Sequence, residues 1–408
     1  MTASPLTILC LASHEKGAAF MRALKAEGCR VLLVTREQEA HAPWPDDAID
    51  ERFLLPTLHQ QRTIIHAISY LARHTRLDRI VALDDLDVET AAALREHLRL
   101  SGMGNTTARH FRDKLAMRVR ARERGFRVPE FVHALNDQRL REWMAAVPGP
   151  WLLKPRSEAS SVGIKRIEHA DELWPALERL GDRRSYYLLE QFIHGPVFHV
   201  DGLLWEYELI FAEAHGYSAP PLAVMQQGGL FRSGTLPRDG NDSRTLRDLT
   251  ARLIGGALRL RQGATHTEFI KSEEDGEFYF LETGARVGGA NIAEMVEAAT
   301  GINLWREWAR LEVAALRGQR YELPPRHEAY AGVLISLARQ EWPDLSAFQE
   351  PEIVWRLHKP YHAGLIARST DHERVRQLLD GYTDRFIQDF HIAVPPKESL
   401  FDDDVMTR

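Results

Sequence analysis

Two glutamates, Glu268 and Glu282, lie in alternating apolar runs on either side of a turn signal at Glu273–Gly276. This pattern is typical of a β-hairpin. If the hairpin closes symmetrically about Asp275, the two glutamates stand opposite each other, with Cβ atoms about 4.5–5.5 Å apart. Two unit charges roughly 5 Å apart repel by about 3 kcal/mol at an effective dielectric constant of about 20. The spacing therefore predicts that the pair binds a cation or shares a proton.

Arg286 follows the second glutamate closely, and Gly288 and Gly289 come soon after it. An arginine side chain offers a planar fork of donors that suits a phosphate, and paired glycines leave the backbone open to close approach. This segment therefore predicts an anion beside the cation, either a phosphate or a developing oxyanion.

Lys154 lies near the end of a compact apolar strand, and a small, hydroxyl-rich loop at 157–163 follows it. Such a loop can fold over phosphates, with backbone N–H groups and serine hydroxyls as donors. Lys114 lies on a helix after a glycine-containing joint, and Glu190 ends a long apolar strand. Taken alone, each residue has an ordinary alternative, since a lone lysine is usually a solvated charge and a strand end usually meets water.

The first hundred residues, which must help to position these groups, alternate short apolar strands with helices. Strands are predicted at 6–12, 30–35 and 79–83, and helices at 18–26, 60–74 and 88–98. This alternation indicates a parallel sheet covered on both faces. The turn after the first strand lacks the G-x-G-x-x-G fingerprint, which disfavours dinucleotide binding.

The rest of the chain is predicted to mix strands and helices. The predicted strands are 151–155, 164–167, 186–193, 198–205 and 331–337, and the predicted helices are 112–125, 171–180, 243–260, 292–299, 304–317 and 373–380. Residues 217–242 are rich in glycine, proline and serine without a clear period, which is typical of an ordered functional loop or a lid. Pro324 and Pro325 mark a boundary before a small α+β module.

The composition is that of an ordinary globular protein of 408 residues, with 44% hydrophobic and 27% charged residues. A net charge of −6 argues against a general nucleic-acid-binding surface. The only cysteines, Cys10 and Cys29, suit a reducing compartment and form no zinc motif. The start of the chain lacks the basic segment of a signal peptide, and no apolar run approaches the roughly 18 residues of a membrane span. We therefore expect a soluble cytoplasmic protein that binds neither nucleic acid nor membrane.

The order of these features along the chain resembles that of the ATP-grasp superfamily, and within it the carboxylate–amine ligases that join amino acids. The resemblance covers roughly residues 1–320, and its most specific part is 263–289. It implies an α/β protein with the ATP-grasp fold. The implied domains are an N-terminal parallel-sheet domain at 1–105, an ATP-grasp core at 106–320 with a lid at about 128–193, and a C-terminal α+β module at 321–408.

The resemblance also implies a reaction. These enzymes use ATP and Mg²⁺, with Mn²⁺ as an alternative ion, to phosphorylate a carboxylate, and an amine then attacks the acyl phosphate. The implied partners are a small-molecule carboxylate, which is an amino acid in the leading hypothesis, and another amino acid or small amine. Ligases of this type are often homodimers. Phosphoryl transfer needs positioning and charge neutralisation rather than a protein nucleophile, which agrees with the absence of a G-x-S-x-G turn.

The resemblance assigns roles position by position. The implied nucleotide contacts are Lys114 and Lys154 at the α- and β-phosphates, Ser160, Ser161 and Gly163 in the loop that closes on the phosphates, Glu190 at the adenine amino group, and the backbone of Phe192 and Ile193 at the ring. Glu268 and Glu282 match the magnesium ligands. Arg286 matches the arginine that steadies the transferring phosphoryl group, and it shares the catalytic role with Lys154.

Two positions depart from the pattern of the family. Many relatives carry asparagine two residues after the second metal-binding glutamate, where this chain has Gly284, so one magnesium contact is missing or supplied by water. Many relatives also have a ribose-binding acid near Val197. Here His199 or Asp201 could take that role, with a structural hydrogen bond as the alternative for either. His266 would point to the same face of its strand as the first glutamate, either lining the site or bonding behind it.

Three other functions stay open on the sequence alone. A ligase of the same superfamily could act on a carboxylate other than an amino acid. A retaining glycosidase also needs two carboxyl groups about 5 Å apart, but this interpretation leaves Lys154, its loop and Arg286 unexplained. A non-catalytic ATP-binding sensor would account for Gly284, although the retention of Glu268, Glu282 and Arg286 together argues against it.

Overall fold

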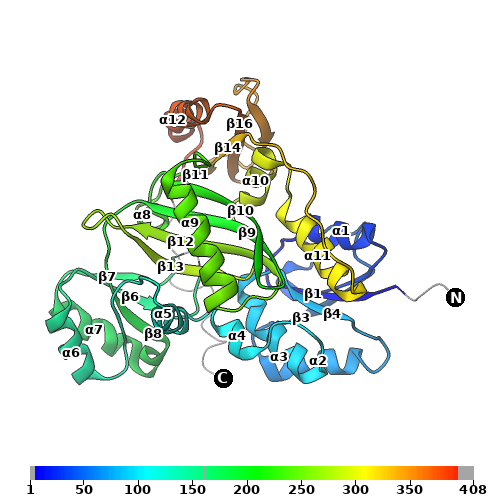
Figure 1. Cartoon of the computed structure of the whole chain (residues 1–408), viewed down its shortest axis with the longest axis horizontal. Coiled ribbons are helices and arrows are strands. Elements are labelled where there is room, and N and C mark those ends of the chain that lie inside the picture. Colours follow the sequence, from blue (N-terminus) through cyan, green and yellow to red (C-terminus); the bar gives the residue numbers. More distant parts are fainter. Residues whose placement is uncertain (1–4, 160, 394–408) are drawn as a thin grey trace.

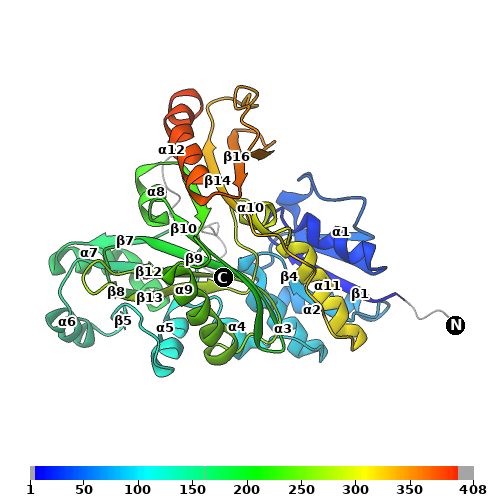
Figure 2. The same cartoon turned by 45° about the horizontal axis from the view of Figure 1, so that its top comes forward.

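The computed structural model describes residues 5–159 and 161–393. Three β-sheets organise this part of the chain, and helices cover them (Figure 1). One sheet is parallel and lies near the N-terminus, one is small and antiparallel, and one is a large central antiparallel sheet. Figure 2 shows the small sheet and the N-terminal sheet on either side of the central strands. Within the described residues, no helix combines the length and the apolar character needed to cross a membrane.

The N-terminal sheet has four parallel strands in the order β3-β2-β1-β4, which confirms the predicted parallel sheet. The strands are β1 Thr7–Ala12, β2 Arg30–Arg36, β3 Glu51–Leu55 and β4 Arg79–Ala82, and the helices beside them are α1 Ala18–Ala26, α2 Gln61–Leu71 and α3 Val88–Leu98. Residues of β1 alternate between two hydrophobic clusters, one on each face of the sheet. The sequence did not predict β3, because this edge strand is only partly buried and lacks a long apolar run.

The small sheet has the strand order β5-β8-β6-β7. Its strands are β5 Phe131–His133, β6 Trp151–Pro155, β7 Lys165–Ile167 and β8 Tyr187–Gln191, and its helices are α6 Asp137–Ala146 and α7 Ala170–Leu180. Sheet and helices share a hydrophobic cluster of their own, which includes Leu140, Trp151 and Leu173. Two further helices, α4 Asn105–Arg109 and α5 Lys114–Glu123, lead from the N-terminal sheet to this one.

The central sheet has eight antiparallel strands in the order β13-β12-β9-β10-β11-β14-β16-β15. They are β9 Val197–Trp205, β10 Glu208–Tyr217, β11 Phe231–Thr235, β12 Gly263–Lys271, β13 Phe278–Gly284, β14 Tyr330–Leu337, β15 Ile353–Arg356 and β16 His362–Ser369. The helices around it are α8 Pro221–Gln227, α9 Asn241–Ala251, α10 Ile292–Thr300, α11 Leu304–Arg317 and α12 His372–Asp389, with a π-helical turn at Arg252–Ala257. Because α11 also packs against α1, it links the central sheet to the N-terminal one (Figure 2).

Residues 217–242 differ from the predicted loop. They contain α8 and β11, and β11 is hydrogen-bonded between β10 and β14 in the central sheet. The sequence does not indicate strand β11, because the glycine and serine residues of this stretch carry little β-propensity. Beyond residue 321, β14, β15 and β16 extend the same sheet and α12 packs on it. The division of the chain into domains stays a prediction.

Candidate active site

The hairpin of β12 and β13 brings the two glutamates together, as the sequence predicts. Glu268 pairs directly with Glu282 in the antiparallel register. The hairpin does not close symmetrically about Asp275, however, because the pairing near the turn is offset by one residue and Leu281 is an extra residue on β13. This bulge corrects the register, and without it Glu268 would face Leu281.

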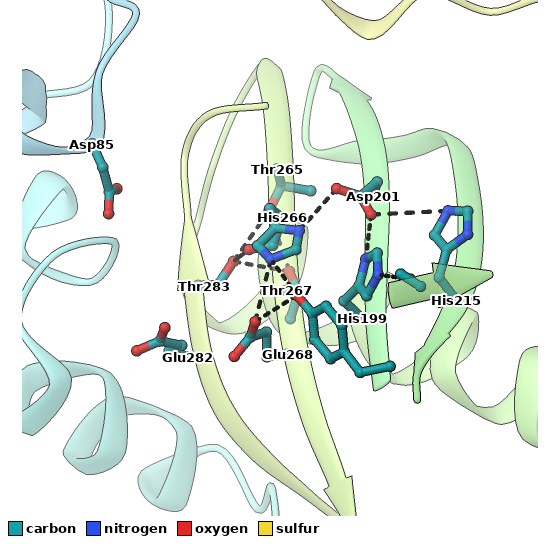
Figure 3. Close-up of polar contacts among 12 residues, drawn as sticks. Asp85, His199, Asp201, His215, Thr265, His266, Thr267, Glu268, Glu282 and Thr283 are labelled. Carbon is teal, nitrogen blue, oxygen red and sulfur yellow. Dashed lines mark hydrogen bonds and ion pairs between the residues drawn. The ribbon is translucent and has the colours of Figure 1, made fainter. Parts of the chain in front are cut away.

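The two glutamate carboxylates are held in different ways, and Figure 3 draws the contacts of Glu268 and the position of Glu282. Glu268 Oε1 accepts a hydrogen bond from the Tyr217 hydroxyl at 2.8 Å and lies 3.4 Å from His266 Nε2. Glu282 Oε2 instead lies 2.9 Å from Nζ of Lys114, which opens helix α5. Burial raises the pKa of Glu282, but the charge and hydrogen bond of Lys114, together with the charge of Lys154, outweigh burial and lower that pKa below its usual value. Glu282 is therefore ionised at neutral pH.

These glutamates form one wall of a cavity between the central sheet and the small sheet. The cavity holds roughly 790 Å³ of empty space, counting its open mouth. The predicted site residues that line it are Lys114, Lys154, Ser161, Glu190, Phe192, Ile193, Glu268 and Glu282. Gly163 lies between two lining residues, with a φ of 71° that favours glycine. Ser160, also predicted here, lies outside the described residues. This lining of lysines, carboxylates and apolar side chains suits a nucleotide.

Glu190 is the buried acid of this cavity. Its carboxylate accepts hydrogen bonds from Arg118 Nε, at 2.7 Å, and from Lys154 Nζ. Burial raises the pKa of Glu190, but these two cations outweigh burial and lower that pKa. The sequence predicts a contact between this carboxylate and an adenine amino group. A carboxylate offers about four acceptor sites, so an adenine would share it with Arg118 and Lys154.

Two of the predicted nucleotide contacts already have partners within the protein. The backbone N–H of Phe192 donates to the carbonyl of Pro150 at 3.0 Å, so this donor is not free for a purine ring. Lys114 Nζ donates to the carbonyl of Glu158 at 2.6 Å. A nucleotide would therefore compete with the protein's own acceptors for Lys114.

Arg286 lies beside the hairpin and faces the loop that follows β4. Its Nη1 donates to the carbonyl of Val287 at 2.9 Å. Its Nε lies 3.5 Å from Asp85 Oδ1 and, within the part of the chain that the structure describes, has no hydrogen-bond partner. Burial lowers the pKa of Arg286, but the charges of Asp85 and Asp84 outweigh burial and raise that pKa above its usual value. Arg286 thus keeps a full charge and a donor that the protein does not use.

His199 does not line the cavity, which argues against its predicted role at a ribose. Its side chain is fully buried, with Nδ1 2.6 Å from Asp201 Oδ2 and Nε2 2.7 Å from the Ser233 hydroxyl. Asp201 Oδ1 in turn lies 2.9 Å from His266 Nδ1. A chain of polar contacts therefore runs from Ser233 to Glu268 behind the cavity (Figure 3). Burial lowers the pKa of His266, but Asp201 and Glu268 outweigh burial and raise it to about 9.

Two groups of side chains could be considered as metal ligands. Ligand atoms of His199, Asp201 and His266 lie within 4.8 Å of one another, but hydrogen bonds already join them. Glu268 and Glu282 instead present carboxylate oxygens to the cavity. Mg²⁺ prefers oxygen ligands and keeps several waters, so the glutamate pair fits this ion and the histidine group does not.

Three residues of the site were not predicted from the sequence. Arg118 lies four residues after Lys114 on one helix, and this spacing could have linked the two side chains. Asp85 follows the carboxyl end of β4, the edge at which parallel sheets commonly bind ligands. Nothing in the sequence connects Tyr217 with Glu268, because these residues meet only through the pairing of β10, β9 and β12.

Comparisons of the sequence with known proteins agree with this geometry. No protein-family model matches the chain. An L-arginine-specific L-amino acid ligase of Bacillus subtilis is 24% identical over 296 residues, which cover 68% of this chain and 70% of that protein. A D-alanine–D-alanine ligase of Neisseria gonorrhoeae is 24% identical over 185 residues, which cover 44% of this chain and 59% of that ligase.

Solved structures match over almost the whole chain. An L-amino acid ligase from Bacillus licheniformis superposes with a TM-score of 0.71 and 19% identity, covering 96% of this chain and 99% of that one. The biotin carboxylase domain of a Hydrogenobacter thermophilus 2-oxoglutarate carboxylase, a dimer in complex with MgADP, ADP and bicarbonate, gives a TM-score of 0.69 at 16% identity, covering 94% and 90%. The chain therefore has the ATP-grasp fold, and its relatives include amino acid ligases, as the resemblance predicts.

Proposed function

We propose that this chain is an ATP- and Mg²⁺-dependent carboxylate–amine ligase, which forms an amide bond through an acyl phosphate. The observation that carries the proposal is the direct pairing of Glu268 with Glu282 at the wall of a cavity that Lys114 and Lys154 also line. Two carboxylates and two lysines around one cavity, with Arg286 beside the same hairpin, suit a metal ion and a triphosphate. The similarity to amino acid ligases supports the same conclusion.

In the first step, a carboxylate oxygen of the substrate attacks the γ-phosphorus of ATP. A new O–P bond forms, the bond from that phosphorus to the β-phosphate oxygen breaks, and ADP leaves with the electron pair. Glu268 and Glu282 would hold a Mg²⁺ ion, which would supply charge neutralisation at the terminal phosphates. Lys154 and Arg286 add fixed positive charge, so the protein needs no nucleophile of its own.

Lys114 changes partner in this scheme. In the free protein its Nζ lies 2.9 Å from Glu282. With nucleotide bound, Lys114 would turn to a phosphate and Glu282 would turn to the cation. Each charge stays compensated in this exchange, whereas a buried carboxylate without a partner would cost about 3–5 kcal/mol.

In the second step, a neutral amine attacks the carbonyl carbon of the acyl phosphate. A C–N bond forms, and Arg286 stabilises the oxyanion of the tetrahedral intermediate. The C–O bond to phosphate then breaks, phosphate leaves with the electron pair, and the new amide nitrogen gives up one proton. The leaving phosphate can accept that proton.

The finer parts of the proposal concern the substrates, the metal ion, the oligomeric state, the cellular location and the domains. We infer that both substrates are amino acids, because the sequence relatives are named for amino acid substrates. Mn²⁺ is the alternative ion, and a homodimer is proposed by analogy with the dimeric neighbour structure. The need for ATP and two free, buried cysteines support a cytoplasmic location. The proposed domains are 1–105, 106–320 with a lid at about 128–193, and 321–408.

The test is the release of ADP and phosphate from ATP and Mg²⁺ over a matrix of amino-acid pairs, with mass spectrometry of each reaction. ADP release that needs two substrates and yields a condensed product would establish the ligase and name its specificity. ADP release with one carboxylate alone would point to an acyl phosphate whose amine is absent from the panel. ATP binding without turnover across a panel that also includes other carboxylates would favour a sensor and overturn the proposal.

A further inference from the structure

Asp201 lies at the centre of a buried polar group behind the hairpin of the two glutamates. Its side chain is fully buried, and its two carboxylate oxygens contact different rings. Oδ2 lies 2.6 Å from His199 Nδ1, and Oδ1 lies 2.9 Å from His266 Nδ1. Burial raises the pKa of Asp201, but His266 and His199 outweigh burial and hold that pKa well below its usual range. An ionised carboxylate can only accept, so Nδ1 of each histidine donates to Asp201 and each ring keeps one orientation.

The His266 ring extends this contact to the hairpin. His266 pairs directly with Asp201 across β12 and β9, and it shares a face of β12 with Glu268. Its Nε2 lies 3.4 Å from Glu268 Oε1 and 3.4 Å from the Tyr217 hydroxyl, which itself donates to that oxygen at 2.8 Å. Figure 3 shows the line of contacts from Asp201 through His266 to Glu268. The orientation of one metal-binding carboxylate therefore depends on a residue behind the cavity.

The loop that follows Arg286 packs on the same contact. A Cβ atom built on Gly288 would lie 2.8 Å from Asp201 Oδ1 and 2.9 Å from His266 Nδ1, and real Cβ atoms do not come so close. A side chain at this position would therefore push Asp201 and His266 out of place. A Cβ atom built on the next residue, Gly289, would meet no atom of the described residues within 4 Å. Close approach to the Asp201–His266 contact thus explains the first glycine of this pair.

Stability alone does not account for a buried carboxylate between two histidines. Well-packed apolar side chains in place of a buried ion pair are often neutral or stabilising, so such a pair is weak evidence of a purely structural role. What a buried hydrogen-bonded carboxylate supplies is a fixed orientation for its partner. Groups that orient metal ligands in this way are typically worth about 10–100-fold in metal affinity.

We propose that Asp201 is a positioning residue of the metal site, which acts through His266 to hold the carboxylate of Glu268 where a divalent cation binds. The inference rests on the proposed function, because it needs that cation at the hairpin. Asp201 does not line the cavity, so it touches neither the cation nor the nucleotide. It keeps the His266 ring in one orientation, with Nε2 beside Glu268 Oε1.

Two other roles for this polar group lead to different results. As a purely structural group, Asp201 would affect the stability of the protein and leave its metal affinity unchanged. If His266 contacted a substrate directly, a change at Asp201 would affect the KM of that substrate and again leave metal affinity unchanged. Metal affinity therefore separates the proposed role from both.

The experiment measures Mn²⁺ binding to the full chain with a non-hydrolysable ATP analogue, by electron paramagnetic resonance, against a blank of nucleotide alone. Asp201→Asn keeps the shape of the side chain, but it removes the charge and leaves one oxygen for two donors. We expect this variant to weaken Mn²⁺ binding at least about tenfold.

His215→Leu is the matched control for disturbance of the buried group. His215 is fully buried on the neighbouring strand β10, and its ring stacks on His199 at a centroid distance of 4.8 Å. Its Nε2 lies 3.9 Å from Asp201 Oδ2, which is too far for a hydrogen bond, and neither ring nitrogen has a hydrogen-bond partner in the part of the chain that the structure describes. We expect this variant to change Mn²⁺ affinity by less than about twofold. Equal losses of affinity in His215→Leu and Asp201→Asn would overturn the inference.

The two glycines provide a second route that leaves every polar side chain in place. Gly288→Ala displaces Asp201 and His266 through its added methyl group, so it should also weaken Mn²⁺ binding. Gly289→Ala adds the same methyl group where nothing lies within 4 Å, and should change that binding by less than about twofold. If thermal unfolding shows that Asp201→Asn does not fold, the comparison of these two variants decides the matter.

Glu282→Gln separates this inference from the proposed function. If Glu282→Gln loses Mn²⁺ binding while Asp201→Asn and Gly288→Ala bind like the wild type, Asp201 does not position a metal ligand and the proposed function stands. If Glu282→Gln itself binds Mn²⁺ like the wild type, the hairpin is not the metal site and both proposals fail.

Discussion

The nucleotide side and the N-terminal side of the site differ in how completely the atoms of their charged groups are hydrogen-bonded. On the nucleotide side, which is the cavity between the small and central sheets, Lys114 is paired with Glu282 and Lys154 with Glu190. On the N-terminal side, which consists of Arg286 and the loop after β4, the structure gives Arg286 Nε and Asp85 Oδ1 no hydrogen-bond partner among the described residues.

This difference separates two uses of buried charge. Paired charges stabilise the free protein, and a ligand must displace one partner to engage the other. A buried charged group that keeps one atom without a hydrogen-bond partner lowers the stability of the free protein, but that atom can meet a ligand without reorganisation. We therefore expect substitutions on the nucleotide side to change stability as well as binding. Substitutions on the N-terminal side should change turnover more than stability.

Glu282→Gln should have the largest effect on activity. The variant removes one carboxylate of the metal pair and also the partner of Lys114, at 2.9 Å. ATP consumption should fall to background, because the terminal phosphates lose their neutralising ion. The measurement is ADP release, with Glu277→Gln as the matched control, since Glu277 belongs to the same hairpin and its side chain is 53% exposed. Normal turnover in Glu282→Gln would show that the hairpin is not the metal site.

Arg118→Met should be the most destabilising change on the nucleotide side. Arg118 Nε donates to Glu190 at 2.7 Å, and both side chains are 1% exposed. Removing one partner of a buried ion pair costs about 3–5 kcal/mol, so the free energy of unfolding in urea should fall by about 3 kcal/mol. Arg122→Met, on the same helix, removes a half-exposed arginine that lies 3.0 Å from Glu130, and should cost less than about 1 kcal/mol. Equal losses in the two variants would mean that the Glu190 pair does not hold the nucleotide side together.

Arg286→Ala should reduce turnover without a comparable loss of ATP affinity. Removing one donor aimed at a developing oxyanion lowers kcat by about 10²–10³-fold. We expect a decrease of this size in kcat, with the Kd for ATP within about threefold of the wild type and a smaller change in the free energy of unfolding than in Arg118→Met. Arg286→Lys keeps the charge but loses the planar fork, and should recover only part of the rate. Parallel losses of rate and ATP affinity would instead make Arg286 a nucleotide anchor.

The sequence predicts the nucleotide side of the site better than the N-terminal side. The ATP-grasp fold and the pairing of Glu268 with Glu282 are confirmed. Lys114, Lys154 and Glu190 do line one cavity, although their roles stay predictions. These features follow from local patterns, namely runs of alternating apolar residues, a turn signal and motifs in a fixed order along the chain.

What the sequence does not predict depends on contacts between distant segments. Asp85 approaches Gly284 only because the loop after β4 packs over the end of β13, and no pattern within either segment signals this approach. The sequence also does not predict the bulge at Leu281, because an extra residue on one strand does not remove the alternating pattern of apolar residues. His199 has the residue type of a ligand, but its contacts with Asp201, two residues along β9, and with Ser233, on β11, keep it away from the cavity.

Tyr217→Phe should have the smallest effect of the four substitutions. The Tyr217 hydroxyl donates to Glu268 Oε1 at 2.8 Å, so the carboxylate of Glu268 is held in place before a metal arrives, unlike that of Glu282. Loss of a hydrogen bond that orients a metal ligand typically costs about 10–100-fold in affinity, and we expect the lower end, about tenfold, in the Mg²⁺ concentration that half-activates ADP release. The phenylalanine ring keeps the contacts of Tyr217 with His199 and Phe231, at centroid distances of 4.5 and 5.7 Å.

Tyr279→Phe is the matched control, because it removes a hydroxyl that donates at 2.8 Å to Asp275 in the turn of the same hairpin, away from the cavity. If both variants need the same Mg²⁺ concentration as the wild type, Glu268 is not preorganised by Tyr217, and the contrast between a fixed and an exchangeable glutamate fails.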